Sequence, residues 1–473
     1  MLTNSQIKNF FIAVFMMSVV TSSYASPDNF VTPLKGFSPS IQDNSDLANF
    51  DQAIEGANVV GLGESTHGTS EFFQMKHRLL KHLVEEKGFT LFAMEVGQAN
   101  AAFINDYVLH GNGDPKQLLK NVYCVPFETQ EVLDMIIWMH DYNLSHNDKI
   151  QFMGIDMQDD SAAIQILTNN VTLTKNKMLI AENQKASQAL ATLNKGITQL
   201  SQDISANKSD AELLKERQLL LETATQTEFI LKKFKTDFTL DKETLSKTLG
   251  DTNYNWTLQT ISLLEQYTEL MPAEVSSMIP SLSDDISDIN LRDRLMSENI
   301  LWIRKQNPRA KLVVWAHSGH IQRTYEFGED PSDVTAKLWK TMGMHLAETL
   351  GDDYRAMTFL TYRGTYTALD ENMHESIHDL YLPPDETIES SIDKMGLPQA
   401  FINLRNKAIL PDFLQGMNQT RQIGAQAEGA EQFVPVRDMS KTFDGIVYLR
   451  DTTAAVNFYL HTHETATHSL LKL

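Results

Sequence analysis

Short and almost wholly apolar runs recur along the chain and alternate with longer segments in which apolar residues repeat at helical spacing. Apolar runs of this length, bounded by turn or polar residues, are typical of buried strands. They lie at residues 57–62, 89–94, 149–155, 311–316, 354–361 and 443–449. Because strands that alternate with helices form parallel sheets covered by helices, we expect an α/β fold with a mostly parallel sheet.

The segment between the first two strands has the clearest helical pattern. Residues 71–87 carry one apolar stripe, and Gly88 marks a C-terminal stop. The stripe consists of Phe72, Phe73, Leu79, Leu80, Leu83 and Val84. Together with its flanking strands this helix forms a βαβ unit, and two further helices are predicted at residues 101–108 and 129–142.

A long segment between the third and fourth strands differs from the rest. Residues 159–296 are rich in Leu, Ala, Gln, Lys, Glu and Thr, contain few glycines and show apolar spacing typical of a helical bundle. We therefore predict a helical insertion there, with the α/β catalytic core split into residues 26–158 and 297–473. Residues 415–431 are predicted to form a loop near the functional site.

The N-terminus has the pattern of a secretory signal. Lys8 precedes the apolar run of residues 10–20, and Ser23-Tyr24-Ala25 forms a small-residue cleavage site. We expect cleavage after Ala25, a periplasmic or secreted protein, and no stable membrane span after removal of residues 1–25. An uncleaved anchor is the alternative, although the run is short for a bilayer.

Composition narrows the class of protein. Of the 473 residues 42% are hydrophobic and 21% are charged, as in soluble globular proteins. The formal net charge of -21 opposes binding to nucleic acid. Cys124 is the single cysteine, so no intramolecular disulfide is possible, and its apolar neighbours favour a buried thiol. No sequence feature indicates an oligomeric state.

Candidate chemistry begins directly after the first predicted strand. Glu64 and His67 lie three positions apart in a glycine-bounded turn that leads into the helix. Histidine titrates near neutral pH and is the most frequent general base, and Glu64 could orient its ring or share a proton or a cation with it. The alternative is a helix-capping turn with a surface histidine.

Three further titratable residues follow other predicted strands: Glu95, Asp156 and His317. The carboxyl ends of parallel strands meet at one edge of a sheet, where ligands bind, so we expect these residues to lie close to Glu64. His320 is less well placed than His317, and Lys76 on the following helix could reach back to the same edge.

Five blocks of sequence resemble the erythromycin esterase family. They are Gly-Leu-Gly-Glu-Ser-Thr-His-Gly at 61–68, Glu-Phe-Phe-Gln-Met-Lys-His-Arg-Leu at 71–79, Phe-Ala-Met-Glu at 92–95, Gly-Ile-Asp-Met-Gln at 154–158 and Trp-Ala-His-Ser-Gly-His at 315–320. The resemblance extends from about residue 57 to about residue 450, and the helical insertion matches it in character more than in residues.

This resemblance implies an α/β core with a helical insertion and hydrolysis of a carboxylic ester or macrolide lactone without a metal or other cofactor. Its general base corresponds to His67, with Glu64, Glu95 and His317 beside it and a basic residue at Lys76. We expect His67 to take a proton from water, Glu64 or Glu95 to orient its ring, and His317 with Lys76 to polarise the carbonyl.

Two alternatives use the same residues. Glu64, His67, Glu95 and His317 could bind a divalent ion in a metal-dependent hydrolase, although no His-Glu-x-x-His motif is present. The chain could also be a periplasmic binding protein that holds a polar ligand without reacting with it. A serine nucleophile is disfavoured because no Gly-x-Ser-x-Gly motif occurs.

Overall fold

A mostly parallel sheet forms the centre of the computed structural model, which describes residues 30–122, 124–282, 287–325, 339–370, 374–427, 429 and 432–458. Within these residues, nine strands pair in the order β1-β8-β11-β6-β2-β5-β3-β4, and β7 pairs with β6. The strands are β1 (Val31–Pro33), β2 (Val59–Leu62), β3 (Phe89–Gly97), β4 (Gln151–Asp156), β5 (Lys311–Trp315), β6 (Tyr354–Leu369), β7 (Glu375–Asp379), β8 (Gln399–Asn403) and β11 (Gly445–Thr452). The α/β prediction is confirmed.

All six predicted strands are present, and they form the parallel part of the sheet from β11 to β4. β1 and β8 pair antiparallel at the other edge, β7 pairs antiparallel with the end of β6, and none of the three was predicted. A separate hairpin joins β9 (Asn418–Arg421) to β10 (Phe433–Val436), so part of the predicted loop at residues 415–431 is a strand.

Helices cover both faces of the sheet because successive strand residues point to opposite sides. Val60, Val313 and Trp315 pack into one apolar cluster with α2 (Ser70–Lys87) and α5 (Gln130–Ser145). Val59, Leu312 and Val314 pack into another cluster with the helices of the insertion. The continuous apolar runs in the sequence thus come from strands that are buried on both faces.

The helix between β2 and β3 has the predicted form. The apolar stripe of α2 is buried, and Gly88 ends the helix with φ of 72° in the left-handed region. The remaining helices of the core are α1 (Ala48–Ala53), α3 (Gln98–His110), α4 (Pro115–Lys120), α12 (Ser318–Ile321), α14 (Met342–Leu350), α15 (Ile388–Asp393), α16 (Asp412–Gln415) and α17 (Met439–Thr442).

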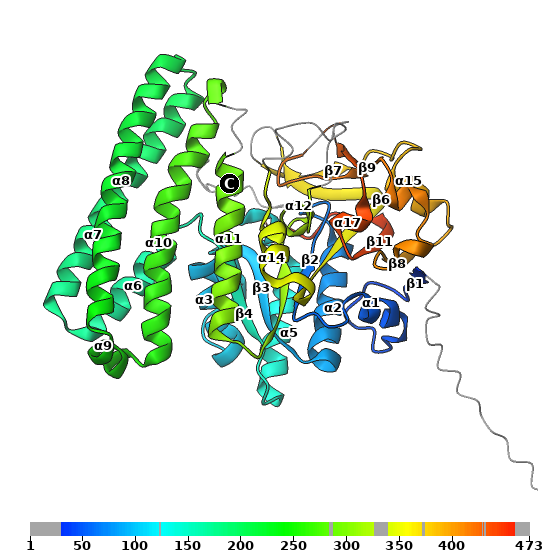
Figure 1. Ribbon diagram of the computed structural model, residues 1–473, viewed down its shortest axis with the longest axis horizontal. Helices are drawn as coiled ribbons and strands as arrows, with labels where there is room; N and C mark the ends of the chain where they lie inside the picture. Colours follow the sequence, from blue (N-terminus) through cyan, green and yellow to red (C-terminus); the bar gives the residue numbers. More distant parts are fainter. Residues whose placement is uncertain are drawn as a thin grey trace, which may run out of the picture.

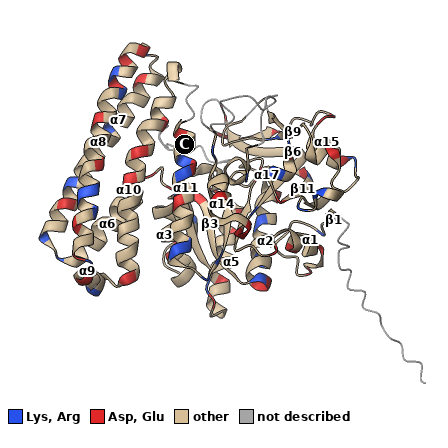
Figure 2. Ribbon diagram, viewed as in Figure 1, with Lys and Arg blue, Asp and Glu red and all other residues tan. Residues whose placement is uncertain are grey.

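The insertion is helical, as predicted, and stands beside the sheet as a bundle of long helices (Figure 1). It consists of α6 (Ser161–Thr174), α7 (Lys177–Ser205), α8 (Asp210–Leu240), α9 (Lys242–Leu249) and α10 (Asp251–Ser277). Acidic and basic residues are interspersed along α7 and α8 (Figure 2), which is typical of a solvated surface.

The predicted boundary at residue 296 falls inside α11 (Ser287–Gln306), which lies between the bundle and the sheet (Figure 1). Among the described residues, no helix has the length and apolar character needed to cross a bilayer. The predicted signal peptide, residues 1–25, lies outside the described residues.

Candidate active site

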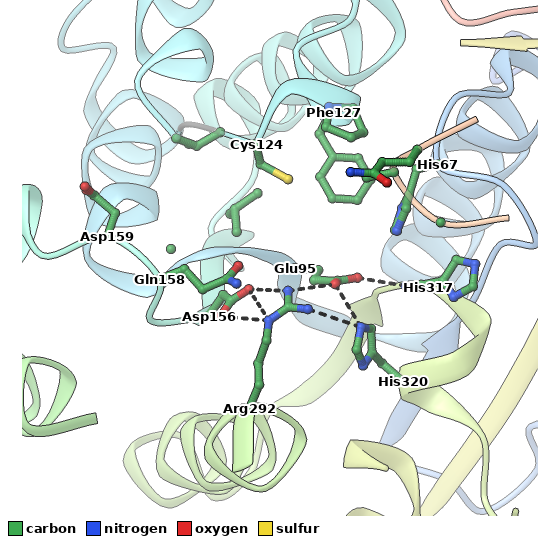
Figure 3. A pocket seen from close by; sticks show the side chains of 17 residues that line it. His67, Glu95, Cys124, Phe127, Asp156, Gln158, Asp159, Arg292, His317 and His320 are labelled. Atoms are coloured by element: carbon green, nitrogen blue, oxygen red, sulfur yellow. Dashed lines mark hydrogen bonds and ion pairs between the residues drawn. The ribbon is translucent and has the colours of Figure 1, made fainter. Parts of the chain in front are cut away.

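A cavity of about 460 Å³ opens at the carboxyl ends of the parallel strands. Figure 3 shows its titratable side chains facing one another from separate elements. The lining includes His67, Glu95, Cys124, Phe127, Asp156, Gln158, Asp159, Arg292, His317 and His320, together with Gly424, Ala425 and Gln426. Of the predicted residues, His67, Glu95 and His317 therefore line the cavity, whereas Glu64 and Lys76 lie behind it.

His67 follows β2 and points into the cavity (Figure 3). Its Nδ1 lies 3.0 Å from Oε1 of Glu64, and its ring meets that of Phe127 edge to face. Burial lowers the pKa of His67 to about 4. The ring is therefore neutral at neutral pH, with Nδ1–H donating to Glu64 and Nε2 available as a proton acceptor.

Glu64 and Lys76 form a buried layer behind His67. Glu64 is 0% exposed and accepts a hydrogen bond of 3.3 Å from Nε1 of Trp315. Nζ of Lys76 contacts the other carboxylate oxygen of Glu64 and lies 4.4 Å from the centre of the Trp315 ring. Burial lowers the pKa of Lys76, and the charge of Glu95 opposes that shift.

The position of Lys76 contradicts its predicted role. With 1% exposure, its ammonium group is shielded from the cavity by Glu64 and does not reach a substrate carbonyl. The sequence suggested that Lys76 could reach the edge of the sheet, but it did not show the direction of the side chain, because a helical lysine nine residues after His67 can point toward solvent or into the core. Lys76 instead compensates the buried charge of Glu64.

Arg292 bridges two of the strand-end carboxylates, and sequence reasoning missed it. Its Nη2 lies 3.0 Å from Oε1 of Glu95 and 2.5 Å from Oδ2 of Asp156. Burial disfavours the charged form of Arg292, but Asp156 and Glu95 hold its pKa well above the usual value. The signal for Arg292 was indirect: two carboxylates at adjacent strand ends require a cation, and α11 supplies it from its second turn.

His320 also takes part in this network. Its Nε2 lies 3.2 Å from Oε1 of Glu95, and its Nδ1 lies 2.8 Å from Oδ1 of Asp293. Burial alone would lower the pKa of His320, but Asp293 and Glu95 raise it to about 10. Because both ring nitrogens then carry protons, the contact of 3.4 Å between Nε2 and Nη1 of Arg292 joins two donors, and Nη1 remains available to a ligand.

His317 lies in the cavity, as predicted, but both of its ring nitrogens have partners within the protein. Nε2–H donates to the carbonyl oxygen of Ile423 at 3.1 Å, and Nδ1 accepts from N–H of Gly319 at 3.2 Å. Burial and the nearby rings of His67 and His320 hold the pKa of His317 well below its usual value. This neutral and fully bonded ring does not fit the predicted role of polarising a carbonyl.

The backbone of His317 connects it to Glu95. Its N–H donates to Oε2 of Glu95 at 2.8 Å, so the two oxygens of Glu95 have different partners. Burial disfavours a charged Glu95, but His320 and Arg292 hold its pKa well below the usual range. Glu95 thus anchors the cationic side of the cavity, whereas Nδ1 of His67 is bound to Glu64.

Two carboxylates of the cavity, Glu95 and Asp156, are paired with the guanidinium group of Arg292. Among the described residues, no three His, Cys, Asp or Glu side chains are arranged as a metal-binding group. Burial raises the pKa of Cys124 well above its usual value, so this cavity-lining cysteine is a thiol. The arrangement is suited to general-base chemistry at His67 opposite a cationic pair, Arg292 and His320.

The family assignment rests on a family model described as erythromycin esterase, which matches residues 84–452. The chain belongs to the erythromycin esterase family. Two curated proteins are similar to it over most of their length. Erythromycin esterase type II of Escherichia coli is 24% identical, with 85% of this chain and 91% of that protein covered. The putative hydrolase YbfO of Bacillus subtilis is 23% identical, with 87% and 88% covered.

Solved structures share the erythromycin esterase fold of this chain. A Bacillus cereus protein superposes with a TM-score of 0.68 at 25% identity, covering 90% of this chain and 96% of its own. A mutant of the erythromycin esterase EreC in its open conformation superposes with a TM-score of 0.65 at 18% identity, covering 90% and 98%. The helical insertion beside the sheet is therefore part of a fold already seen in solved structures.

Proposed function

We propose that the chain is an exported hydrolase of the erythromycin esterase type that cleaves a carboxylic ester or a macrolide lactone, with His67 as the general base. The observation that carries this proposal is the neutral ring of His67, held by Glu64 and directed into the cavity opposite Arg292 and His320. Membership of the erythromycin esterase family supports ester hydrolysis as the reaction.

In the proposed reaction, Nε2 of His67 takes a proton from a water molecule while the water oxygen attacks the carbonyl carbon. Glu64 stabilises the imidazolium that forms, and Nη1 of Arg292 donates to the developing oxyanion. The carbon–oxygen bond to the alcohol then breaks, and the alkoxide takes the proton from His67. The products are a carboxylic acid and an alcohol, and the enzyme returns to its starting state.

Replacing His67 tests the base directly. His67→Ala should lower kcat/KM for a model ester by about a hundredfold to ten-thousandfold, the usual contribution of general-base catalysis. His146→Ala, which removes an exposed histidine stacked on Tyr142, should leave activity unchanged. Both variants should keep the circular dichroism spectrum of the parent, and full activity of His67→Ala would exclude His67 as the base.

The substrate class needs a separate experiment. Curated relatives named erythromycin esterase motivate macrolide lactones as candidates, although identity to them is 24% or less. We would incubate the purified protein with macrolides, simple lactones and linear esters and look by mass spectrometry for products that have gained one water. Tight binding with no product from any compound would favour the non-catalytic binding protein.

Metal dependence is tested on the same substrates. Because Glu95 and Asp156 are neutralised by Arg292 and Glu64 by Lys76, we expect activity to survive dialysis against a chelator. Activity lost on dialysis and restored by zinc or manganese would favour the metal-dependent hydrolase.

Export is proposed from the N-terminal sequence alone. Lys8, the apolar run that follows it and the site at Ala25 support cleavage of residues 1–25 and a periplasmic or secreted location. Intact-mass measurement of protein recovered from the periplasm or the medium should give a chain that begins at Ser26. A chain that retains Met1 would contradict cleavage.

A further inference from the structure

One wall of the cavity is a short backbone segment, residues 422–427, which we call the cover segment. Three of its residues, Gly424, Ala425 and Gln426, line the cavity. N–H of Ile423 donates to the carbonyl oxygen of Ser65 at 2.8 Å, so the cover segment is tied to the turn that carries His67. On its other side, N–H of Leu369 in β6 donates to Ala425 at 3.0 Å.

The side chain of His317 supplies a further tie to the cover segment. Its Nε2–H donates to the carbonyl oxygen of Ile423, the residue whose N–H is bound to Ser65. Both polar groups of the Ile423 backbone are therefore held, one by the turn after β2 and one by the turn after β5. The cover segment thus lies between the two strand ends that carry His67 and His317.

Only one form of the His317 ring satisfies both of its hydrogen bonds. Nδ1 must be unprotonated to accept from Gly319, and Nε2 must be protonated to donate to Ile423. Neither nitrogen has a lone pair or a proton left for a substrate. The ring of His317 lies 4.8 Å from that of His67, so a neutral His317 also avoids repelling the imidazolium that forms at His67.

We propose that His317 is a positioning residue, which holds the cover segment against the cavity through Ile423 and thereby shapes the wall that a substrate contacts. It acts on substrate binding and takes no part in proton transfer. The kinetic part of this inference rests on the proposed ester hydrolysis, whereas the structural part does not.

Two isosteric variants separate the two hydrogen bonds of His317. The amide nitrogen of glutamine lies near the position of Nε2, so His317→Gln retains a donor for Ile423. The shorter asparagine places its polar atoms near Nδ1, so His317→Asn retains an acceptor for Gly319 and loses the tie to the cover segment. The matched control is His146→Asn, because His146 is exposed and does not contact Ile423 or Gly319.

Hydrogen exchange of peptides that span residues 418–427 measures the tie without any substrate. Loss of one hydrogen bond should speed exchange about 2- to 10-fold in His317→Asn, while His317→Gln and His146→Asn should match the parent. In steady-state kinetics, His317→Asn should raise KM by a similar factor with kcat changed less than about threefold, and His317→Gln should restore KM.

Two results would overturn the proposal. Unchanged exchange in His317→Asn would show that His317 does not hold the cover segment. A loss of kcat of about a hundredfold or more in both variants would assign His317 to the chemistry instead. If His67→Ala retained full activity, the proposed base would be wrong while the exchange result would still decide the role of His317.

Discussion

Charge compensation around His67 explains why its ring is neutral. Three buried carboxylates near the cavity have a cation against them: Lys76 for Glu64, and Arg292 for Glu95 and Asp156. His67 therefore has Glu64 as a hydrogen-bond acceptor whose charge is already balanced. Under these conditions burial dominates and holds the pKa of His67 at about 4, far below that of an exposed histidine.

The two shifted histidines predict the pH dependence of activity. A general base works when it is neutral, so activity should rise as pH increases through about 4, the pKa of His67. His320 is charged below about 10, so activity should fall as pH increases through that value and the cationic side loses a charge. The measurement is kcat/KM across this range, corrected for unfolding followed by circular dichroism. A rise in kcat/KM centred near pH 6.5 would contradict a buried His67 with a lowered pKa.

The ion pair between Glu64 and Lys76 should contribute more to the stability of the fold than to substrate binding. Lys76→Met leaves the Glu64 charge buried without a partner, which should cost about 3–5 kcal/mol in the free energy of unfolding. The double variant with Glu64→Gln removes that charge and should recover most of the loss. Urea unfolding of the parent, both single variants and the double variant measures this coupling. Equal stability of Lys76→Met and the parent would contradict the ion pair.

At the scale of the elements, strand ends were predictable and side-chain directions were not. The buried runs identified β2 to β6 and β11, and their parallel pairing brought Glu64, Glu95, Asp156 and His317 to one edge. Local sequence does not show which way Lys76 points, or which residue of α11 reaches Glu95, because both depend on how helices pack. The short antiparallel strands were missed because β7 and β8 lack a long apolar run.

The insertion contributes one direct link to the cavity through α10. Gln158 lines the cavity, and its Nε2 donates to Oε1 of Glu274 on α10 at 2.8 Å. With its amide nitrogen held there, Gln158 can offer its oxygen to a ligand as an acceptor. This contact is where the helical insertion reaches the candidate site.

Glu274 should make stability depend on pH. Burial raises its pKa from 4.5 to about 7, so the folded state keeps a proton that the unfolded state loses. Stability should therefore fall as pH increases between these values, and Glu274→Gln should lack this fall. Relative to the parent, the variant should gain about 1–3 kcal/mol in unfolding free energy on going from pH 5 to pH 8. If the difference in unfolding free energy between variant and parent were the same at pH 5 and pH 8, the raised pKa of Glu274 would be contradicted.

Across the whole molecule, the sheet and the bundle share one apolar cluster. Leu312 and Leu360 of the sheet belong to the same cluster as Leu190 of α7 and Leu264 of α10. The core and the insertion are thus separate segments of the sequence, but in the folded protein they share one cluster of buried apolar residues.

This shared cluster predicts a single unfolding transition. Urea unfolding followed by far-ultraviolet circular dichroism should coincide with unfolding followed by a fluorophore on α8, for example at the exposed Phe229 after Phe229→Cys and Cys124→Ala. Cys124→Ala alone is the control for the dye-labelling background. Two separated transitions would show that the bundle unfolds independently of the sheet.

Because of the strand order, some strands are synthesised long before the strands that lie next to them in the sheet. β5 lies between β2 and β3, yet it follows β3 by about 200 residues in the sequence, with the entire bundle in between. At roughly 5–20 residues per second, a ribosome needs roughly 10–40 s to make that stretch. During this time β2 and β3 have emerged and the strand that joins them has not. The nascent chain therefore passes through a period in which β2 and β3 have unpaired edges, and molecular chaperones that bind such edges should bind it during that interval.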